Sequence, residues 1–272
     1  MWWLDPKLND GVATRHFASL DAVFALSGEL MASAPMSHVI RVECEGKRYY
    51  VKRYEGNGRR LVRRWFGLRQ WLVPPRVRAE WRNLERFAAW GIPTARLAAY
   101  GLERRWGGFR RGALITEEVC DSDDLATLAA NADPHLRDGV WVRTVLEQTA
   151  AATRRMHAEG FVHNDLKWRN LLVTRGRTPQ VHFIDCPNGG FWWGPFLRYR
   201  IIKDLACLDK VAKYELSRTQ RLRFFLAYLG VARLPAGEKA RVRRIVAFFE
   251  GRECWAWKPI SMRPADQRKG PS

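Results

Sequence analysis

The sequence lacks paired cysteines and long apolar runs. Its five cysteines are scattered and form no Cys-x-x-Cys pair, which argues against a disulfide framework or a zinc site and for a reducing compartment. No apolar run approaches the roughly 18 residues that span a bilayer. The N-terminus has no basic start followed by an apolar stretch, so we expect no signal peptide. We expect a protein of the cytoplasm, or one that lies on a membrane from the cytoplasmic side.

Acidic residues are also scarce. Lys and Arg number 47 against 28 Asp and Glu, which gives a net charge of +19. This imbalance does not determine a fold, but it favours an anionic partner such as nucleic acid, an acidic membrane or a phosphorylated substrate. A merely basic soluble protein is the alternative interpretation. The length of 272 residues suits one large domain or two lobes.

The order of the expected elements separates a strand-rich part from a helical part. Alternation, helical spacing and turn residues predict a hairpin at 39–44 and 48–53, a helix at 76–90, strands at 95–102 and 112–119, a helix at 139–159, short strands at 171–174 and 181–184, and helices from 201 onward. An acidic connector at 120–124 divides the two parts. We therefore predict an α+β fold with a first lobe over 1–119 and a second lobe over 120–272.

One segment of the second lobe, 163–170, carries the clearest chemistry. His163, Asp165, Leu166 and Asn170 form the pattern His-x-Asp-Leu-x-x-x-Asn of a loop that catalyses phosphoryl transfer from ATP, and Asp185 follows 15 residues later. Carboxylate and amide oxygens suit Mg²⁺, so Asn170 and Asp185 are the predicted metal ligands. Asp165 is the predicted acceptor for the proton of an attacking hydroxyl. The non-catalytic interpretation makes the two aspartates a turn residue and a strand-end cap.

The first lobe offers an independent check of this hypothesis. A kinase needs a strand lysine that holds the phosphates of ATP and a helix glutamate that positions this lysine. Lys52 lies in the strand YYVKRY, and Glu80 lies on the next predicted helix, with Glu85 as the alternative partner. Lys167, two residues after Asp165, is predicted to offset charge on the γ-phosphate during transfer. Its alternative role is that of a solvated loop residue.

Four segments together resemble a known superfamily. They are VHNDLKWRNLLV (162–173), FIDC (183–186), KDLACLDK (203–210) and YYVKRY (49–54). Over about residues 35–215 the chain resembles the protein-kinase-like superfamily, and within it the bacterial lipopolysaccharide-core sugar kinases, which phosphorylate heptose or Kdo (3-deoxy-manno-octulosonic acid). The resemblance implies ATP and Mg²⁺ as cofactors. It also implies a small β-rich N-lobe with one main helix and a larger, mostly helical C-lobe.

Further residue roles follow only from this resemblance. It implies a hinge at 113–125, in which Thr116 borders the adenine pocket and the backbone of Glu117 and Val119 bonds the adenine edge. It also implies that Asp204 supports the catalytic loop, although a carboxylate at a helix N-terminus would be favourable in any case.

Two features depart from the protein-kinase pattern. No Gly-x-Gly-x-x-Gly precedes Lys52, so we expect the turn that covers the phosphates within 33–38, and Asp-Cys-Pro stands at 185–187 in place of Asp-Phe-Gly. The second departure argues against regulation by a flip of that segment, but not against Asp185 as a metal ligand.

The segment 186–203 is the predicted substrate segment. It is short and contains no Ser or Thr, which argues against a protein substrate. Its aromatic residues suit sugars and membrane interfaces, and its cations suit phosphate and carboxylate; they are Phe191, Trp192, Trp193, Phe196, Arg198, Arg200 and Lys203. These residues predict an acidic glycolipid substrate at the anionic surface of the inner membrane, with aromatic packing inside the second lobe as the alternative. The Arg-rich stretch 59–72 is either a membrane-surface helix or an ordinary helix of the first lobe.

The leading hypothesis is therefore an ATP-dependent kinase that phosphorylates a sugar hydroxyl of the lipopolysaccharide inner core, with Asp165 as catalytic base. A small-molecule kinase for cationic amines or an atypical protein kinase is the alternative within enzymes, and the basic charge argues against the first of these. A pseudokinase or a nucleic-acid-binding module is the alternative outside them. A pseudokinase is expected to lose a catalytic residue, whereas Lys52, Asp165, Asn170 and Asp185 are all present. No nucleic-acid-binding motif occurs, so we expect no nucleic acid partner.

Overall fold

The computed structural model describes residues 1–8, 11–56, 74–105 and 108–250. The predicted basic stretch 59–72 therefore lies outside the described residues. The chain divides into two compact units. The first contains Met1–Ala89, Thr94–Val119 and Asp185–Asn188, and the second contains Trp90–Pro93, Cys120–Ile184 and Gly189–Ser272. The four residues that begin with Asp185 thus group with the N-terminal part of the chain.

The first unit is built on a six-stranded antiparallel sheet with the strand order β1-β5-β6-β4-β3-β2. Its strands are β1 (Trp2–Leu4), β2 (Glu29–Ala34), β3 (Ser37–Cys44), β4 (Lys47–Glu55), β5 (Leu97–Arg105) and β6 (Gly108–Glu117). Glu45 and Gly46 turn the β3–β4 hairpin with φ values of +53° and +72°, the conformation of a tight hairpin turn. Pro35 and Met36 turn the β2–β3 hairpin, inside the predicted 33–38 segment.

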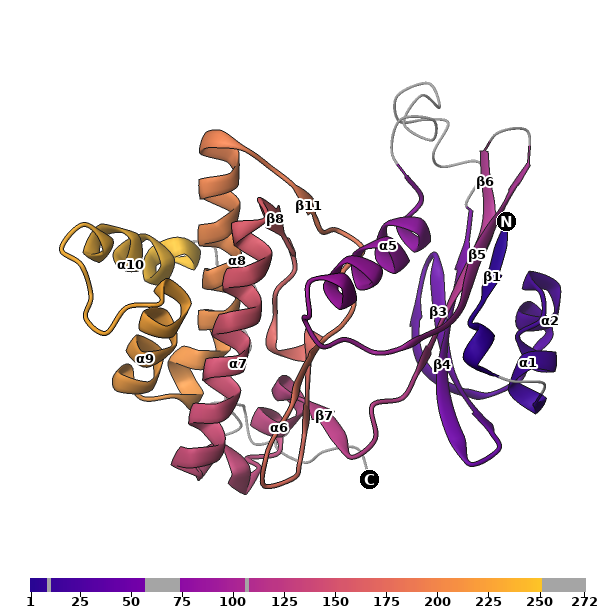
Figure 1. The fold of residues 1–272 in the computed structure, drawn as a ribbon, viewed down its shortest axis with the longest axis horizontal. Helices are drawn as coiled ribbons and strands as arrows, with labels where there is room; N and C mark the ends of the chain where they lie inside the picture. The colour runs from indigo at the N-terminus through magenta and orange to yellow at the C-terminus, as the bar shows by residue number, and fades with distance from the viewer. Residues whose placement is uncertain (9–10, 57–73, 106–107, 251–272) are drawn as a thin grey trace. The chain divides into compact units, whose positions relative to one another are not determined.

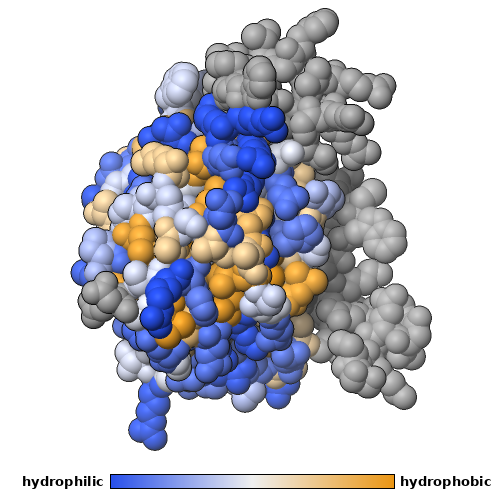
Figure 2. Space-filling view, turned by 90° about the vertical axis from the view of Figure 1, so that its right-hand side faces the viewer, coloured by the Kyte–Doolittle hydropathy of each residue, from blue (hydrophilic) through white to orange (hydrophobic). Residues whose placement is uncertain are grey.

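Helices cover both faces of this sheet (Figure 1). On one face lies α5 (Arg76–Ala89), whose buried Val77, Trp81 and Leu84 recur at helical spacing, as the sequence predicted. On the other face lie α1 (Val12–His16) and α2 (Leu20–Ala25), together with the short 3₁₀ helix η1 (Pro6–Leu8). Seen from this second side, hydrophobic side chains gather near the middle of the surface among hydrophilic ones (Figure 2).

The second unit consists mainly of helices. They are α6 (Leu125–Ala130), α7 (Gly139–Ala158), α8 (Gly194–Glu215), α9 (Arg218–Leu229) and α10 (Glu238–Val246), with the 3₁₀ helices η2 (Pro134–Arg137), η3 (Trp168–Asn170) and η4 (Ala247–Phe249). Helix α7 ends before Gly160, whose φ of +72° is one that glycine adopts readily. Helix α9 packs against α7, and α10 packs against α8 (Figure 1).

Small strands complete the second unit. They are β7 (Ser122–Asp124), β9 (Leu171–Thr174) and β10 (Val181–Phe183) in one sheet, and β8 (Phe161–Val162) and β11 (Gly190–Phe191) in another. The α+β prediction is confirmed, with two local corrections. The expected connector 120–124 includes strand β7, which pairs with β9. Helix α8 begins at Gly194, seven residues before the predicted start at 201, because Pro195 is compatible with a first helical turn. No described helix is long and apolar enough to cross a membrane.

Candidate active site

The first unit brings Lys52, Glu80 and Asp185 together. Lys52 on β4 extends its ammonium Nζ to 3.0 Å from Glu80 Oε1 and 2.5 Å from Asp185 Oδ1. Glu85, the alternative partner, instead accepts a hydrogen bond from the hydroxyl of Tyr100. Lys52 therefore pairs with Glu80 and not with Glu85, the alternative that the sequence left open.

Burial sets the electrostatics of this group. Glu80 is 3% exposed, and burial raises its pKa in spite of the nearby Lys52 ammonium. Burial alone would lower the pKa of Lys52, but the carboxylates of Glu80 and Asp185 outweigh it and the pKa is raised. Tyr54 donates its hydroxyl to Glu80, and burial together with that carboxylate raises its pKa. Lys52 therefore stays an ammonium, held between two acidic groups from different parts of the chain.

Asp185 is held by its backbone as well as by Lys52. Its φ of +55° lies in the left-handed region, which aspartate tolerates better than most residues. The next residue, Cys186, accepts a hydrogen bond through its carbonyl from Asn83 Nδ2 at 2.7 Å. Sequence reasoning missed Asn83. The available signal was a polar residue one helical turn after Glu80. The sequence does not indicate that this residue contacts Cys186.

The second unit contains the predicted catalytic loop. Lys167 Nζ lies 2.5 Å from Asp165 Oδ1, within the few ångströms that its proposed charge-offsetting role requires. Arg169, which sequence reasoning did not single out, approaches the other oxygen of the same carboxylate at 3.6 Å. Asn170 is buried and donates from Nδ2 to the carbonyl of Asp165 at 2.8 Å. The loop therefore gathers two cations around one carboxylate and ties Asn170 to its backbone.

A second set of contacts holds the residue before Asp165. Asn164 has a φ of +64°, and its Oδ1 accepts a hydrogen bond from Arg200 Nη1 at 2.7 Å. The guanidinium of Arg200 lies 3.6 Å from the ring centroid of Trp192. Trp192 in turn donates its backbone N–H to the carbonyl of Gly160. The sequence pointed to Arg200 as a substrate cation but gave no sign of this contact with the loop.

Asp204, on helix α8, binds the backbone at the start of the catalytic loop. It is fully buried on α8, and its Oδ2 accepts a hydrogen bond from the backbone N–H of His163 at 2.7 Å. His157 contacts this carboxylate and a tyrosine. Its Nε2 lies 3.5 Å from Asp204 Oδ2, and its Nδ1 lies 2.9 Å from the hydroxyl of Tyr228. Because α8 begins at Gly194, Asp204 lies well inside the helix, and the alternative of a helix N-terminal carboxylate is wrong.

The expected hinge lies at the end of β6. Thr116 pairs with Tyr50 of β4 and Leu97 of β5, so it is a sheet residue. Glu117 donates its backbone N–H to the carbonyl of Arg96 at 2.9 Å. This N–H is therefore already hydrogen-bonded within the protein. The adenine contacts of Thr116, Glu117 and Val119 stay predictions.

The donor types of Asn170 and Asp185 fit a magnesium ion. A side-chain amide oxygen and a carboxylate oxygen are the hard ligands that Mg²⁺ takes, usually with water and substrate phosphates completing the shell. Among the described residues, no group of three or more His, Cys, Asp or Glu side chains is arranged to hold a metal. The metal-ligand roles of Asn170 and Asp185 stay predictions.

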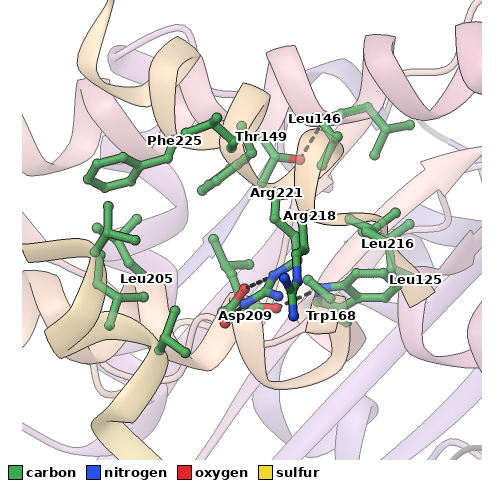
Figure 3. Close-up of a pocket in the computed structure, with 18 of the residues that line it drawn as sticks. Leu125, Leu146, Thr149, Trp168, Leu205, Asp209, Leu216, Arg218, Arg221 and Phe225 are labelled. Atoms are coloured by element: carbon green, nitrogen blue, oxygen red, sulfur yellow. Dashed lines mark hydrogen bonds and ion pairs between the residues drawn. The ribbon is translucent and has the colours of Figure 1, made fainter. Parts of the chain in front are cut away.

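A separate apolar cavity of about 450 Å³ lies in the second unit (Figure 3). Leucine, valine, isoleucine and phenylalanine side chains of α7, α8, α9 and α10 form most of its wall. Its polar residues include Asp209 and Arg221, joined by two bonds of 2.7 and 2.6 Å. Trp168, from the catalytic loop segment, also lines it and donates Nε1 to the carbonyl of Leu208. One wall of the cavity is thus part of the same segment as Asp165.

Comparisons with known proteins agree with this geometry. The sequence model of the Lipopolysaccharide kinase (Kdo/WaaP) family matches residues 26–228. The Lipopolysaccharide core heptose(I) kinase WaaP of Pseudomonas aeruginosa is 25% identical over 224 residues, which cover 76% of this chain and 79% of that protein. Its Escherichia coli counterpart of the same name is 25% identical over 146 residues, 53% of this chain and 54% of that protein.

One solved structure, described as WaaP in complex with acyl carrier protein, aligns with a TM-score of 0.68 and 22% identity, over 93% of this chain and 97% of that chain. This likeness confirms the protein-kinase-like fold that the sequence predicted.

Proposed function

The chain belongs to the lipopolysaccharide kinase (Kdo/WaaP) family, and from this premise we propose that it transfers the γ-phosphate of ATP to a heptose or Kdo hydroxyl of the lipopolysaccharide inner core. The observation that carries the proposal is the pair of ion pairs that Lys52 forms with the buried Glu80 and the partly exposed Asp185. Such an arrangement holds a cation where kinases bind the phosphates of ATP. The relatives that match along the sequence are both named as heptose(I) kinases of the core.

In the proposed reaction, the sugar hydroxyl oxygen bonds to the γ-phosphorus while the bond from that phosphorus to the β–γ bridging oxygen breaks. Asp165 accepts the hydroxyl proton, and ADP leaves with the bridging oxygen. Lys167 offsets negative charge on the transferring group. Lys52 orients the α- and β-phosphates, and Glu80 orients Lys52. Asn170 and Asp185 would hold Mg²⁺, which neutralises phosphate charge when bound.

The first unit takes the nucleotide in this proposal. Thr116 borders the adenine, and the backbone carbonyl of Glu117 and the backbone of Val119 form hydrogen bonds with its edge. The β2–β3 turn at Pro35 and Met36 covers the phosphates, with the backbone N–H of Met36 as a donor that Pro35 lacks. The second unit, which contains Asp165, takes the sugar.

The proposed acceptor is an acidic glycolipid, reached from the cytoplasmic face of the inner membrane. The net charge of +19 supports an anionic partner of this kind. The relatives' printed names support lipopolysaccharide core as its chemical class.

Mass spectrometry of lipopolysaccharide from a deletion strain tests the proposal. We expect the inner core of that strain to lack one phosphate. A plasmid-borne wild-type gene should restore it, and the Asp165→Asn gene should not. An unchanged core in the deletion strain would remove the support for this function.

We further propose that the apolar cavity holds the acyl chain of an acyl carrier protein. A mainly apolar cavity of about 450 Å³ suits a hydrocarbon chain, and the structural relative was solved with this carrier. Binding to the folded state alone should raise the melting temperature. We expect acylated carrier to raise it and carrier without an acyl chain to have little effect. Equal shifts with the two carriers, or none with either, would contradict an acyl site.

A further inference from the structure

The start of α8 exposes aromatic side chains of the predicted substrate segment, and the reaction proposed above assigns none of them a role. Trp193 is 76% exposed, Phe196 66% and Tyr199 47%. Single exposed apolar side chains are ordinary, but a group of exposed aromatic side chains in one place marks an interaction site. We call these three residues, together with the cations Arg198 and Lys203, the α8 surface.

Helical geometry explains why these aromatics share one side of α8. Phe196, Tyr199 and Lys203 recur at spacings of three and four residues, which places them along one face of the helix. Trp193 caps the helix immediately before the first turn. The buried residues of α8, which begin at Ile201 and include Leu205 and Leu208, pack into the core of the second unit. Trp193 and Phe196 are therefore presented outward, and Tyr199 is half-exposed beside the ring of Phe248, while the later turns anchor the helix.

The charge of this region is one-sided. The 18 residues from 186 to 203 contain no Asp or Glu. Arg198 is exposed beside the aromatics, and Lys203 is partly exposed on the same helix. An anionic surface would meet no like charge within this segment.

The α8 surface is also fixed to the catalytic loop. Arg200, on the same two turns, donates to Asn164 at 2.7 Å, and Asn164 is the residue before Asp165. Trp192, on which Arg200 stacks, follows strand β11, which pairs with β8 just before the loop. A ligand bound at the α8 surface would therefore lie beside the residues proposed to act on the acceptor sugar.

We propose that the α8 surface docks on an anionic lipid bilayer and so brings the catalytic loop to a lipid-linked acceptor. Trp and Tyr rings combine an apolar body with a polar edge and prefer the headgroup region of a membrane. Cations interleaved with such rings bind anionic headgroups. The inference rests on the proposed function in one respect: membrane docking is useful only if the acceptor is a glycolipid. The choice of a bilayer rests on the aromatic and cationic composition of the surface.

Sedimentation with vesicles tests the docking directly, with full-length protein and without nucleotide or sugar. The vesicles contain phosphatidylethanolamine with phosphatidylglycerol, or phosphatidylcholine alone as the uncharged comparison. We expect the wild type to bind the anionic vesicles and the variant W193S/F196S to bind them more weakly by on the order of tenfold or more. The matched control is Tyr214→Ser. Tyr214 is 39% exposed near the other end of α8, and its replacement should leave vesicle binding unchanged.

The outcomes separate this inference from the kinase proposal. The exposed positions of Trp193 and Phe196 should let the double variant fold, which its melting curve checks. A folded double variant that binds anionic vesicles like the wild type would overturn the inference. So would a wild type that binds neither kind of vesicle but retains an acidic protein through these aromatics, because the surface would then be a protein-docking site. Since no ATP or sugar is present, a failed phosphoryl-transfer assay would leave the vesicle result intact.

Discussion

Lys52 depends on two carboxylates whose removal has different consequences. Glu80 is buried and bonds only groups of the first unit among the contacts described, whereas Asp185 is more exposed and is the proposed metal ligand. Loss of Glu80 should therefore disturb the position of the lysine without touching the proposed metal ligand. Glu85, on the same helix but bonded to Tyr100, offers a natural comparison.

We expect Glu80→Gln to raise the KM for ATP about tenfold, because a charge-assisted hydrogen bond is worth ~1.5–3 kcal/mol. Glu85→Gln should leave the KM for ATP near the wild-type value. Steady-state kinetics with varied ATP measure both. Equal effects of the two substitutions would mean that Glu80 has no special part in holding Lys52.

Lys167 should act mainly in the transition state. Its ammonium touches Asp165, yet the side chain is 44% exposed and so has room to reach a bound phosphate. We expect Lys167→Ala to lower kcat by on the order of 10²–10³ and to raise the KM for ATP much less. An alanine variant with unchanged kcat would assign Lys167 to the solvated surface and leave the role of Asp165 untouched.

Arg200 should position the loop through Asn164. We expect Arg200→Ala to lower kcat about tenfold with a smaller change in the KM for ATP, since the lost hydrogen bond fixes the residue before the base. Arg200→Lys keeps the charge but loses the planar group that stacks on Trp192, so it should recover only part of the rate. Full recovery with lysine would show that charge alone matters at this position.

Residues whose chemistry dictates their spacing could be predicted from the sequence. Asp165, Asn170 and Asp185 match the spacing of the kinase catalytic pattern, and their catalytic and metal-binding roles stay predictions. Asn83 and Arg200 could not be assigned in this way, because their partners Cys186 and Asn164 are distant in the chain and the contacts exist only after folding. The choice of Glu80 over Glu85 also required the structure, since both glutamates lie on one helix and only its rotation decides between them.

Strand β1 is held at the edge of the first sheet by an ion pair as well as by its ladder with β5. Arg96 binds Asp5 Oδ2 through Nη2 at 2.6 Å and Nε at 3.0 Å. Burial alone would raise the pKa of Asp5, but the backbone N–H of Lys7 and the guanidinium of Arg96 stabilise its charged form and hold the pKa below its ordinary value of 3.8. Because the unfolded chain binds the proton more readily, this contribution is present above pH 3.8 and is lost as the pH falls through the lower folded value.

We expect Asp5→Asn to lower the melting temperature by about 2–4 °C near neutral pH, as about 1 kcal/mol does in a chain of this size. The difference from the wild type should shrink as the pH falls below about 4. Asp21→Asn is the control, because Asp21 pairs with Arg111 but is 83% exposed and should contribute little. A difference that stays constant down to about pH 3 would assign the effect to packing rather than to the charge of Asp5.

Elements with a strong period and a clear stop signal could be predicted closely. Helices α5 and α7 end before Gly91 and Gly160, where the left-handed backbone of glycine stops them. The start of α8 could not, because glycine, proline and exposed aromatics precede its buried residues and suggest a loop. Strand β7 was hidden for a different reason: its acidic residues have low strand propensity, and only the partner strand β9 makes it extended.

The chain as a whole combines a kinase fold with an unusually basic surface. The expected two-lobed architecture is confirmed by a solved relative that aligns over 93% of this chain. The charge of +19 favours the anionic acceptor and the anionic membrane surface that we propose, which a fold alone does not specify. Asp165 links these two properties in the proposed reaction, in which it receives the proton of the acceptor hydroxyl.

Phosphoryl transfer in a purified system tests this most directly. The wild type and Asp165→Asn are incubated with Mg²⁺, ATP and inner-core glycolipid, and mass spectrometry follows the glycolipid. We expect the wild type to add one phosphate to a heptose or Kdo residue. The Asp165→Asn protein should melt like the wild type and add almost none, because only the proton acceptor is lost. A wild type that leaves the glycolipid unmodified, or a folded Asp165→Asn variant with wild-type turnover, would contradict the account.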